Sequence, residues 1–190
     1  MALAFVTSNK HKFLEVKEIA EKHGIKIVQR SLPVIEIQSG SLAEIARFSA
    51  NHAFSILKSP CFVEDAGIFI SALNGFPGPY SKFVFMTIGN AGVLKLLNKN
   101  NNRDAKFISA VGYCNGSRKT KVFLKSVAGK ISQKPRGTFG FGFDPIFIPE
   151  EGDGRTFGEM SIEEKNAFSH RAKAVEAFFK WFKKKNTEGR

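Results

Sequence analysis

Residues 3–20, LAFVTSNKHKFLEVKEIA, contain the junction that decides the fold class. The apolar run at residues 3–6 predicts a short buried strand, and the polar residues 7–9 after it are typical of a helix cap. Apolar residues then recur at helical spacing as far as Gly24, which predicts a helix that ends there. A buried strand that runs directly into a helix is the repeating unit of α/β proteins.

Further strands are predicted from β-rich apolar runs along the chain. These runs are residues 25–28, 61–64, 68–70, 107–114 and 121–127. Asp65, Ala66 and Gly67 separate two of them, so we expect the chain to leave the sheet there. Asn115-Gly116 predicts a turn that adds an antiparallel part. The sequence therefore predicts a mixed sheet in an α/β protein.

Two Ser-x-x-Glu capping boxes predict helix starts, at Ser41 with Glu44 and at Ser161 with Glu164. The last helix should begin near Asn166 and continue into the lysine-rich terminus. Shared apolar spacing predicts the buried positions of the two long helices: Leu42, Ile45, Ala46, Ala50, Ala53 and Leu57, then Ala172, Val175, Phe179 and Phe182. We also expect a short helix at residues 91–97, an irregular or edge segment at 33–40 and a turn-rich loop at 75–79. Residues 138–142 are rich in Gly and Phe, and Asp144-Pro145 breaks this stretch. With no repeat or long linker, residues 1–190 should form a single domain.

Composition and charge restrict the classes of function. The hydrophobic fraction of 43% is enough for a sizeable core, in which the 20 Phe residues replace Leu. A net charge of +12 attracts nucleic acid, membrane surfaces or phosphorylated metabolites, and does not choose among them. Part of this charge lies in the lysines of residues 180–185, which follow an amphipathic helix and are typical of a solvated tail.

The two cysteines, Cys61 and Cys114, lie in predicted strands and should be buried free thiols of a reducing compartment. Their number and spacing exclude a disulfide framework and a cysteine metal site. The apolar run at the N-terminus is too short for a signal peptide, and no stretch approaches a membrane span. We therefore expect a cytoplasmic protein with no membrane partner.

The first candidate site is the helix start Thr7-Ser8-Asn9-Lys10-His11-Lys12. A helix N-terminus presents unpaired N–H groups and a positive dipole end, which suits a phosphate. The segment lacks the glycines of a P-loop. An ordinary cap with a basic first turn accounts for the same residues, although those cations oppose the dipole until an anion binds.

A second candidate is a set of spaced acids: Glu36, Glu64 and Asp65. Mg²⁺ commonly takes one or two carboxylates together with phosphate oxygens and water. Glu64 and Asp65 should end an apolar strand, at the sheet edge where ligand sites of α/β proteins gather. Each acid taken singly is better explained as a capping or turn residue.

Three further segments carry suitable side chains. Residues 75–82, GFPGPYSK, form a rigid loop from which Lys82 can reach a phosphate. Residues 139–145, FGFGFDP, place small residues between aromatic rings, so that a flat base can stack, although a glycine-rich core strand has the same pattern. Residues 163–171, EEKNAFSHR, hold donors for base oxygens or are simply a charged helix start.

Taken together and in this order, these segments resemble the inosine triphosphate pyrophosphatase family, also called XTP/dITP diphosphatases. The runs that carry the resemblance are TSNKHK (7–12), EDAGIFISALNGFPGPYSK (64–82), FGFDPIF (141–147) and EMSIEEKNAFSHRAKA (159–174). The resemblance implies an elongated mixed sheet flanked by helices, with two lobes and a cleft between them. It also implies a Mg²⁺-dependent homodimer that hydrolyses non-standard purine nucleoside triphosphates to the monophosphate and pyrophosphate.

The resemblance also assigns roles to residues of this sequence. Asp65 would be the catalytic base for the attacking water, and Glu36 and Asp65 would bind the metal. The positions that would contact the nucleotide are Thr7, Ser8, Asn9, Lys10, His11, Lys12, Ala66, Lys82, Phe141, Gly142, Phe143, Asp144, Lys165, His170 and Arg171. Three positions depart from the family's usual residues: Ala66 replaces a hydroxyl residue, Phe143 a common Trp, and Ser8 a frequent Gly.

Base selectivity has a simple physical expectation. Inosine and xanthosine carry an acceptor at position 6 of the purine, where adenosine carries a donor. Donors from His170 and Arg171 would match the first two and remain unpaired against the third, at about 1–3 kcal/mol for each unmet buried donor. Rejection of GTP needs a wall near its 2-amino group, which the sequence does not place.

Two other functions fit parts of the pattern. A related pyrophosphatase for pyrimidine or methylated nucleotides begins with a Ser and paired arginines, which residues 7–12 do not match. A non-catalytic nucleotide or RNA binder is compatible with the charge but leaves Glu36 and Asp65 unexplained. We therefore expect a small-molecule nucleotide substrate and no stable nucleic-acid partner.

Overall fold

The structure is a computed structural model that describes residues 2–116 and 119–188. The chain falls into two compact units by its internal contacts. Unit 1 comprises residues 1–65, 109–125 and 171–190, and unit 2 comprises residues 66–108 and 126–170. Three long strands contribute residues to both units: β3 (Cys61–Ile70), β5 (Asp104–Cys114) and β6 (Lys121–Ile131).

In the described residues, seven strands form one sheet in the order β2-β1-β3-β5-β6-β7, with β4 paired to β3. The four short strands are β1 (Leu3–Val6), β2 (Ile27–Arg30), β4 (Pro77–Gly78) and β7 (Phe147–Pro149). β1 runs parallel to β2 and to β3, whereas β4 is antiparallel to β3 and β7 to β6. The prediction of a mixed sheet with flanking helices is confirmed.

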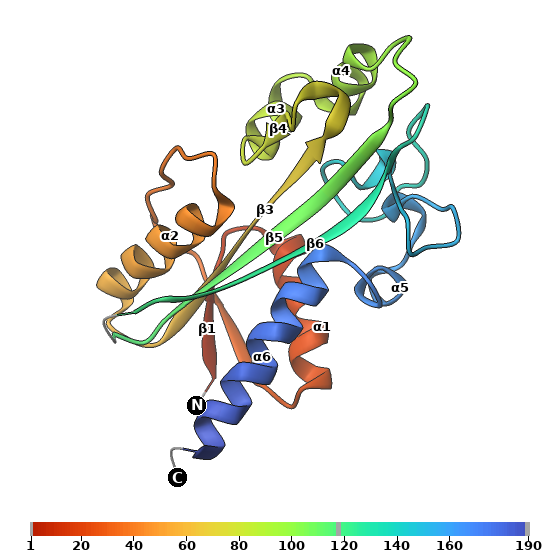
Figure 1. Ribbon diagram of the computed structural model, residues 1–190. Helices are drawn as coiled ribbons and strands as arrows, with labels where there is room; N and C mark the ends of the chain where they lie inside the picture. Colours follow the sequence, from red (N-terminus) through yellow and green to blue (C-terminus); the bar gives the residue numbers. More distant parts are fainter. Residues whose placement is uncertain (1, 117–118, 189–190) are drawn as a thin grey trace. The chain divides into compact units, whose positions relative to one another are not determined.

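Helices cover both faces of the unit 1 sheet (Figure 1). α1 (Lys10–Lys22) and α6 (His170–Glu188) lie on one face, where Phe62 of β3 contacts the rings of Phe178 and Phe179 of α6. α2 (Leu42–Leu57) lies on the other face. The contact side of α2 is rich in alanine, and a Cβ at Gly112 of β5 would lie 2.3 Å from the carbonyl oxygen of Ala46. Small residues on both sides therefore let this helix approach the sheet closely.

Unit 2 is built around aromatic side chains. Its helices are α3 (Ser81–Thr87), α4 (Gly89–Leu96) and α5 (Ile162–Asn166), with 3₁₀ turns η1 (Ser71–Leu73), η2 (Asp144–Ile146) and η3 (Phe157–Glu159). Phe107, Phe147 and Phe157 contact one another in the buried core of this unit. The abundant Phe thus fills the core, as the composition predicted.

The predicted break at residues 65–67 is wrong, because β3 is continuous from Cys61 to Ile70. Glu64 and Asp65 therefore lie in the middle of a strand and do not end one. Gly67 is tolerated there because β4 passes directly over it: an added Cβ would lie 2.2 Å from the carbonyl oxygen of Gly78. Gly67 thus marks a close approach of β3 and β4, and not a break between two strands.

Several helix predictions also need correction. α3 was not predicted, and the strand expected at residues 25–28 lies at Ile27–Arg30. The Ser41 side chain accepts from the backbone N–H of Glu44 and so caps the helix. The Glu44 carboxylate accepts from the Ser39 hydroxyl and does not complete a capping box. The last helix is interrupted, since α5 ends at Asn166 and α6 begins at His170, directly after a serine of the kind that favours helix starts. Leu57 and Phe182 are only partly buried.

Two other predictions are confirmed, the second capping box and the buried thiols. The capping box of Ser161 and Glu164 is complete. Cys61 and Cys114 are buried free thiols. The connection after Asn115-Gly116 includes residues 117–118, which lie outside the described part. No helix in the described ranges is long and apolar enough to cross a membrane.

Candidate functional site

The start of α1 forms a capped turn after β1. Asn9 is the N-cap, and its side-chain oxygen accepts from the backbone N–H of Lys12 at 3.1 Å. The Thr7 hydroxyl oxygen accepts from the N–H of Asn9, and the Thr7 N–H donates to the carbonyl of Arg30. Ser8, Lys10 and His11 are exposed, and the first turn contains no acid. The turn thus keeps the positive dipole end expected for an anion site.

Lys12 points from this turn toward β3. Its Nζ atom lies 3.0 Å from Oε2 of Glu64 and 3.0 Å from the Glu64 carbonyl oxygen. The Lys12 side chain keeps 16% exposure, whereas that of Glu64 is fully buried. The predicted phosphate turn therefore lies against the residue that precedes Asp65.

Glu64 belongs to a buried ionic cluster of unit 1. Ser109 of β5 donates to Oε1 of Glu64 at 2.6 Å, and Nε of Arg171 lies 3.2 Å from Oε2. Arg171 also forms an ion pair with Glu15 of α1, and both of these side chains are almost fully buried. Arg171, predicted to contact the base edge, lies in this cluster.

Two opposite influences act on the Glu64 carboxyl. Burial raises its pKa, but Arg171, Lys12 and the Ser109 hydroxyl outweigh it and hold the pKa well below the ordinary glutamate value. Glu64 is therefore ionised throughout the physiological range. A buried carboxylate with several donors is stable in the charged form only while those donors stay in place.

Asp65 and Glu36 are the predicted metal ligands. Successive side chains of a strand point to opposite faces, so Asp65 shares the face of Cys61 and not that of Glu64. The Cys61 sulfur lies 4.0 Å from the Ala50 carbonyl, which identifies this as the α2 face. Glu36 is exposed in the segment before α2, whose Ile35 N–H donates to Nδ1 of His52 in α2. Both acids thus belong to the α2 side of unit 1.

In unit 2, the Asp144 carboxylate organises the predicted base-binding loop. Its Oδ2 atom accepts from the backbone N–H of Phe141 at 2.8 Å and from Nζ of Lys165 at 2.7 Å. Gly140 has a φ of +72°, and an added Cβ there would lie 2.1 Å from Asp144 Oδ2. Only glycine combines this backbone with this approach to the carboxylate.

Aromatic rings surround the Lys165 ammonium. Its Nζ atom lies 5.3 Å from the ring centroids of both Phe141 and Phe157. Phe143 packs edge-on against Phe85 of α3, with ring centroids 5.5 Å apart. Four predicted residues, Phe141, Phe143, Asp144 and Lys165, are therefore brought together in one unit, with the cation placed for cation–π contact.

The other predicted positions of unit 2 are His170, Lys82, Ala66 and Gly142. His170 is buried and stacks on Phe107, with centroids 4.4 Å apart and planes 7° from parallel. Lys82 is exposed in the first turn of α3, and Ala66 is partly buried in β3. An added Cβ at Gly142 would meet nothing within 4 Å, and its carbonyl accepts from the Asn90 side chain at 3.2 Å.

Sequence reasoning did not assign Glu15 or Ser109 a role. A signal for Glu15 existed, because it lies beside Val16 and Ile19 on the buried face of α1. A charge on the apolar face of a helix indicates a buried partner. The Asn90 contact had no comparable signal, since it depends on how α4 meets a distant loop.

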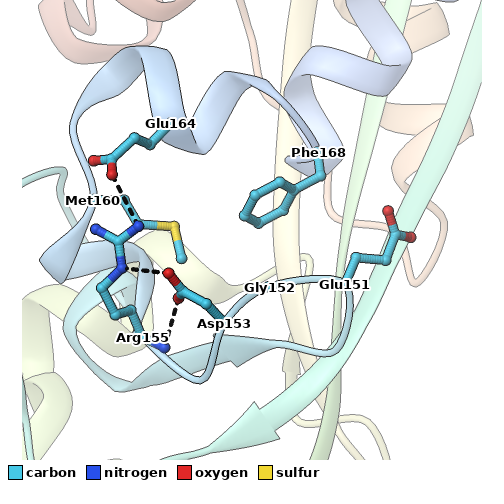
Figure 2. A pocket seen from close by; sticks show the side chains of 7 residues that line it. All are labelled: Glu151, Gly152, Asp153, Arg155, Met160, Glu164 and Phe168. Atoms are coloured by element: carbon cyan, nitrogen blue, oxygen red, sulfur yellow. Dashed lines mark hydrogen bonds and ion pairs between the residues drawn. The ribbon is translucent and has the colours of Figure 1, made fainter.

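Unit 2 also contains a cavity of about 380 Å³, lined by Glu151, Gly152, Asp153, Arg155, Met160, Glu164 and Phe168 (Figure 2). Arg155 lies between two of its acids, with nitrogen–oxygen distances of 2.8 Å to both Asp153 and Glu164. None of the predicted site residues lines it. We therefore treat the residue group of each unit, and not this cavity, as a candidate site.

Comparison with known proteins gives a consistent result. The sequence model described as "Ham1 family" matches residues 3–181. A "dITP/XTP pyrophosphatase" of Methanopyrus kandleri is 50% identical over 190 residues, which is 100% of both chains. A protein of the same description from Saccharolobus solfataricus is 49% identical over 93% of this chain and 91% of its own.

Solved structures agree. A HAM1 protein of Coxiella burnetii is 29% identical, with a TM-score of 0.84, and covers 97% of this chain and 100% of its own. The Ham1 protein of Staphylococcus aureus is 25% identical, with a TM-score of 0.80, and covers 96% and 99% respectively.

Proposed function

This chain belongs to the Ham1 family, and from that premise we propose that it hydrolyses purine nucleoside triphosphates with a non-standard base, namely ITP, dITP and XTP. The products would be the nucleoside monophosphate and pyrophosphate, so that such nucleotides leave the nucleotide pool. The observation that carries the proposal is the identity of 50% over the full length of a protein described as a dITP/XTP pyrophosphatase.

Unit 1 supplies the groups suited to a triphosphate. A triphosphate carries about four negative charges at neutral pH, so its neutralisation is a large part of the task. The capped start of α1 offers backbone N–H groups, with Ser8, Lys10 and His11 exposed beside them. Lys12 adds an ammonium group that retains some access to solvent. These donors would hold the phosphates and the leaving pyrophosphate.

The acids of unit 1 fit Mg²⁺. This ion is commonly held by one or two carboxylates plus substrate phosphates and water. Among the described residues there is no group of three or more His, Cys, Asp or Glu side chains that suits an ion. We propose that Glu36 and Asp65 hold an ion that the substrate helps to bind. When bound, Mg²⁺ would neutralise phosphate charge.

Asp65 would act as the base. Its carboxylate would orient a water molecule in line with the α-phosphorus and accept a proton as the water oxygen forms its new bond. The bond between the α-phosphorus and the oxygen that bridges to the β-phosphorus breaks, and the electron pair leaves with pyrophosphate. A carboxylate is a weak base, so the position of the water should matter more than the pKa.

Unit 2 supplies the groups suited to a purine. Phe141 would stack on the base, while Gly142 adds no side chain to obstruct it. Lys165 and His170 would contact the base edge, and Asp144 holds Lys165 and the Phe141 backbone in place. Arg171, also assigned to the base edge by the resemblance, is held by Glu15 and Glu64.

The test is product analysis with dITP, XTP, GTP and ATP, with and without Mg²⁺. We expect pyrophosphate and monophosphate from dITP and XTP, little turnover of GTP or ATP, and loss of turnover without the metal. Release of orthophosphate would contradict the proposed bond cleavage. An absence of turnover together with tight RNA binding would instead support a non-catalytic binder.

We also propose that the protein is a cytoplasmic homodimer. The side chains of Phe83 and Met86 on α3 are 68% and 75% exposed, and large exposed apolar groups often mark protein contacts. Light scattering coupled to gel filtration should give twice the mass of 21.0 kDa. Phe83→Glu should restore the mass of one chain. The free buried thiols support a reducing compartment, which fractionation of cells would check.

A further inference from the structure

Glu64 was expected only as one of the spaced acids, and the structure gives it several polar contacts within the protein. Both carboxylate oxygens are engaged: Oε1 by the Ser109 hydroxyl, and Oε2 by Lys12 and Arg171. The side chain has no exposed surface. Mg²⁺ needs an oxygen that it can reach together with its water ligands, and a fully buried carboxylate beside two protein cations does not offer one. Glu64 is therefore placed to pair with the side chains of Lys12 and Arg171 and not with a metal ion.

The cluster contains charges of both signs. Lys12 and Arg171 supply two positive charges, and Glu15 and Glu64 supply two negative ones. Of these four side chains Lys12 is the most exposed, at 16%, and the other three are almost fully buried. One ammonium donor is hydrogen-bonded to the carbonyl oxygen of Glu64 at 3.0 Å, and the Nζ atom also lies at ion-pair distance, 3.0 Å, from Oε2. These two contacts restrict the orientation of the ammonium group.

We propose that Glu64 is a positioning residue that fixes the Lys12 ammonium beside the α1 turn, so that its remaining donor faces a bound phosphate. This inference rests on the proposed function for the role of Lys12 as a phosphate ligand. A free lysine side chain loses rotamer entropy when it is immobilised. Glu64 makes that loss part of folding, so it does not recur when substrate binds.

A binding experiment tests the proposal without turnover. The affinity of inorganic triphosphate is measured by calorimetry for the wild type, Glu64→Ala, Glu64→Gln and Lys12→Met, and for the two Glu64 variants in the Lys12→Met background. Gln keeps the size and the acceptor oxygen of Glu64, whereas Ala keeps neither. We expect Glu64→Ala to weaken binding about fivefold or more and Glu64→Gln about twofold. In the Lys12→Met background both effects should fall below about twofold, because Glu64 acts through Lys12.

Two outcomes would overturn the proposal. Equal losses for Ala and Gln that persist in the Lys12→Met background would show a charge effect that bypasses Lys12. Losses that follow only the folded fraction, measured by thermal melting of each variant, would show a structural role. If Glu64→Ala does not fold, Ser109→Ala replaces it, since this change removes one contact of the carboxylate and no charge. Its effect must likewise vanish in the Lys12→Met background.

Glu18→Ala is the matched control. Glu18 lies on α1, the helix that contains Lys12, and pairs with Lys22 at 2.8 Å, but its side chain is 27% exposed. Its removal should leave triphosphate binding unchanged. Turnover of dITP separates the two proposals: coupled binding effects in a protein without pyrophosphatase activity would refute the proposed function and leave the role of Glu64 intact. In an active enzyme, Glu64→Ala should raise KM for dITP more than it lowers kcat, because the lost Lys12 contact already contributes to binding of the triphosphate.

Discussion

The Nζ atom of Lys165 lies 2.7 Å from Oδ2 of Asp144, and the two side chains are only 2% and 4% exposed. The same oxygen accepts from the backbone N–H of Phe141. One buried carboxylate therefore fixes both the cation and the aromatic residue of the candidate base site. Because a buried charge without its partner is strongly unfavourable, this pair should control stability as well as recognition.

Asp144→Asn should destabilise the protein by about 3–5 kcal/mol, since it removes a buried counter-charge of the Lys165 ammonium. Lys165→Met should lower the stability by a similar amount, because it removes a buried counter-charge of the Asp144 carboxylate. The double variant should be more stable than the sum of the two losses predicts, because no isolated charge remains. Urea unfolding of all four proteins measures this coupling. If the losses of the two single variants in the free energy of unfolding simply add in the double variant, the proposed coupling is contradicted.

The matched control for this pair is Asp153→Asn. Asp153 pairs with Arg155 at 2.8 Å, but its side chain is 57% exposed. Water replaces the lost contact at such a site, so the unfolding midpoint should hardly change. Lys165→Met should in addition lower kcat/KM for dITP, whereas Asp153→Asn should not.

Asp65→Asn should lower kcat for dITP by about two to four orders of magnitude, the range expected when a general base is removed. The amide has nearly the same size, so the melting temperature should stay close to that of the wild type. Asp104→Asn, at the exposed start of β5, is the control and should retain full activity. Normal turnover by Asp65→Asn would exclude this residue as the base.

Gly140→Ala should be less stable than Gly142→Ala. Both glycines have positive φ, +72° and +63°, so an alanine is strained at either position. Only at Gly140 would the new Cβ press on the Asp144 carboxylate, at 2.1 Å. We expect this overpacking to add about 1–3 kcal/mol to the loss at Gly140. Equal unfolding midpoints for the two variants would argue against the contact with Asp144.

Cys61 should be chemically inert in the folded protein. Burial, with a smaller contribution from Cys114, raises the pKa of its thiol from 9.0 to about 12. The neutral thiol is favoured by folding, so its contribution to stability is complete below pH 9.0 and is lost as the pH rises toward 12. The free energy of unfolding should therefore fall less steeply above pH 9.0 in Cys61→Ala than in the wild type. Iodoacetamide at pH 8 should label Cys61 only after denaturation.

Short-range patterns were enough for most elements of the fold. The caps at Asn9, Ser41 and Ser161 are formed by residues within three positions, so they can be predicted locally. The errors occurred where distant segments meet. Gly67 resembled a turn residue because the sequence does not reveal that β4 passes over it. α3 was missed because its first turn continues a loop rich in Gly and Pro.

The sequence alone determined the α/β class, the aromatic core and, through four ordered motifs, the resemblance to a family. These properties depend on residue type and local spacing, which a linear chain carries in full. Only the tertiary structure decided which charges meet. Glu64 became the partner of Lys12 and Arg171, and Asp144 the partner of Lys165, because strand and helix packing brings together side chains that are 21 to 107 residues apart. Burial then makes each pairing obligatory, since a charge removed from water must find its counter-charge within the protein.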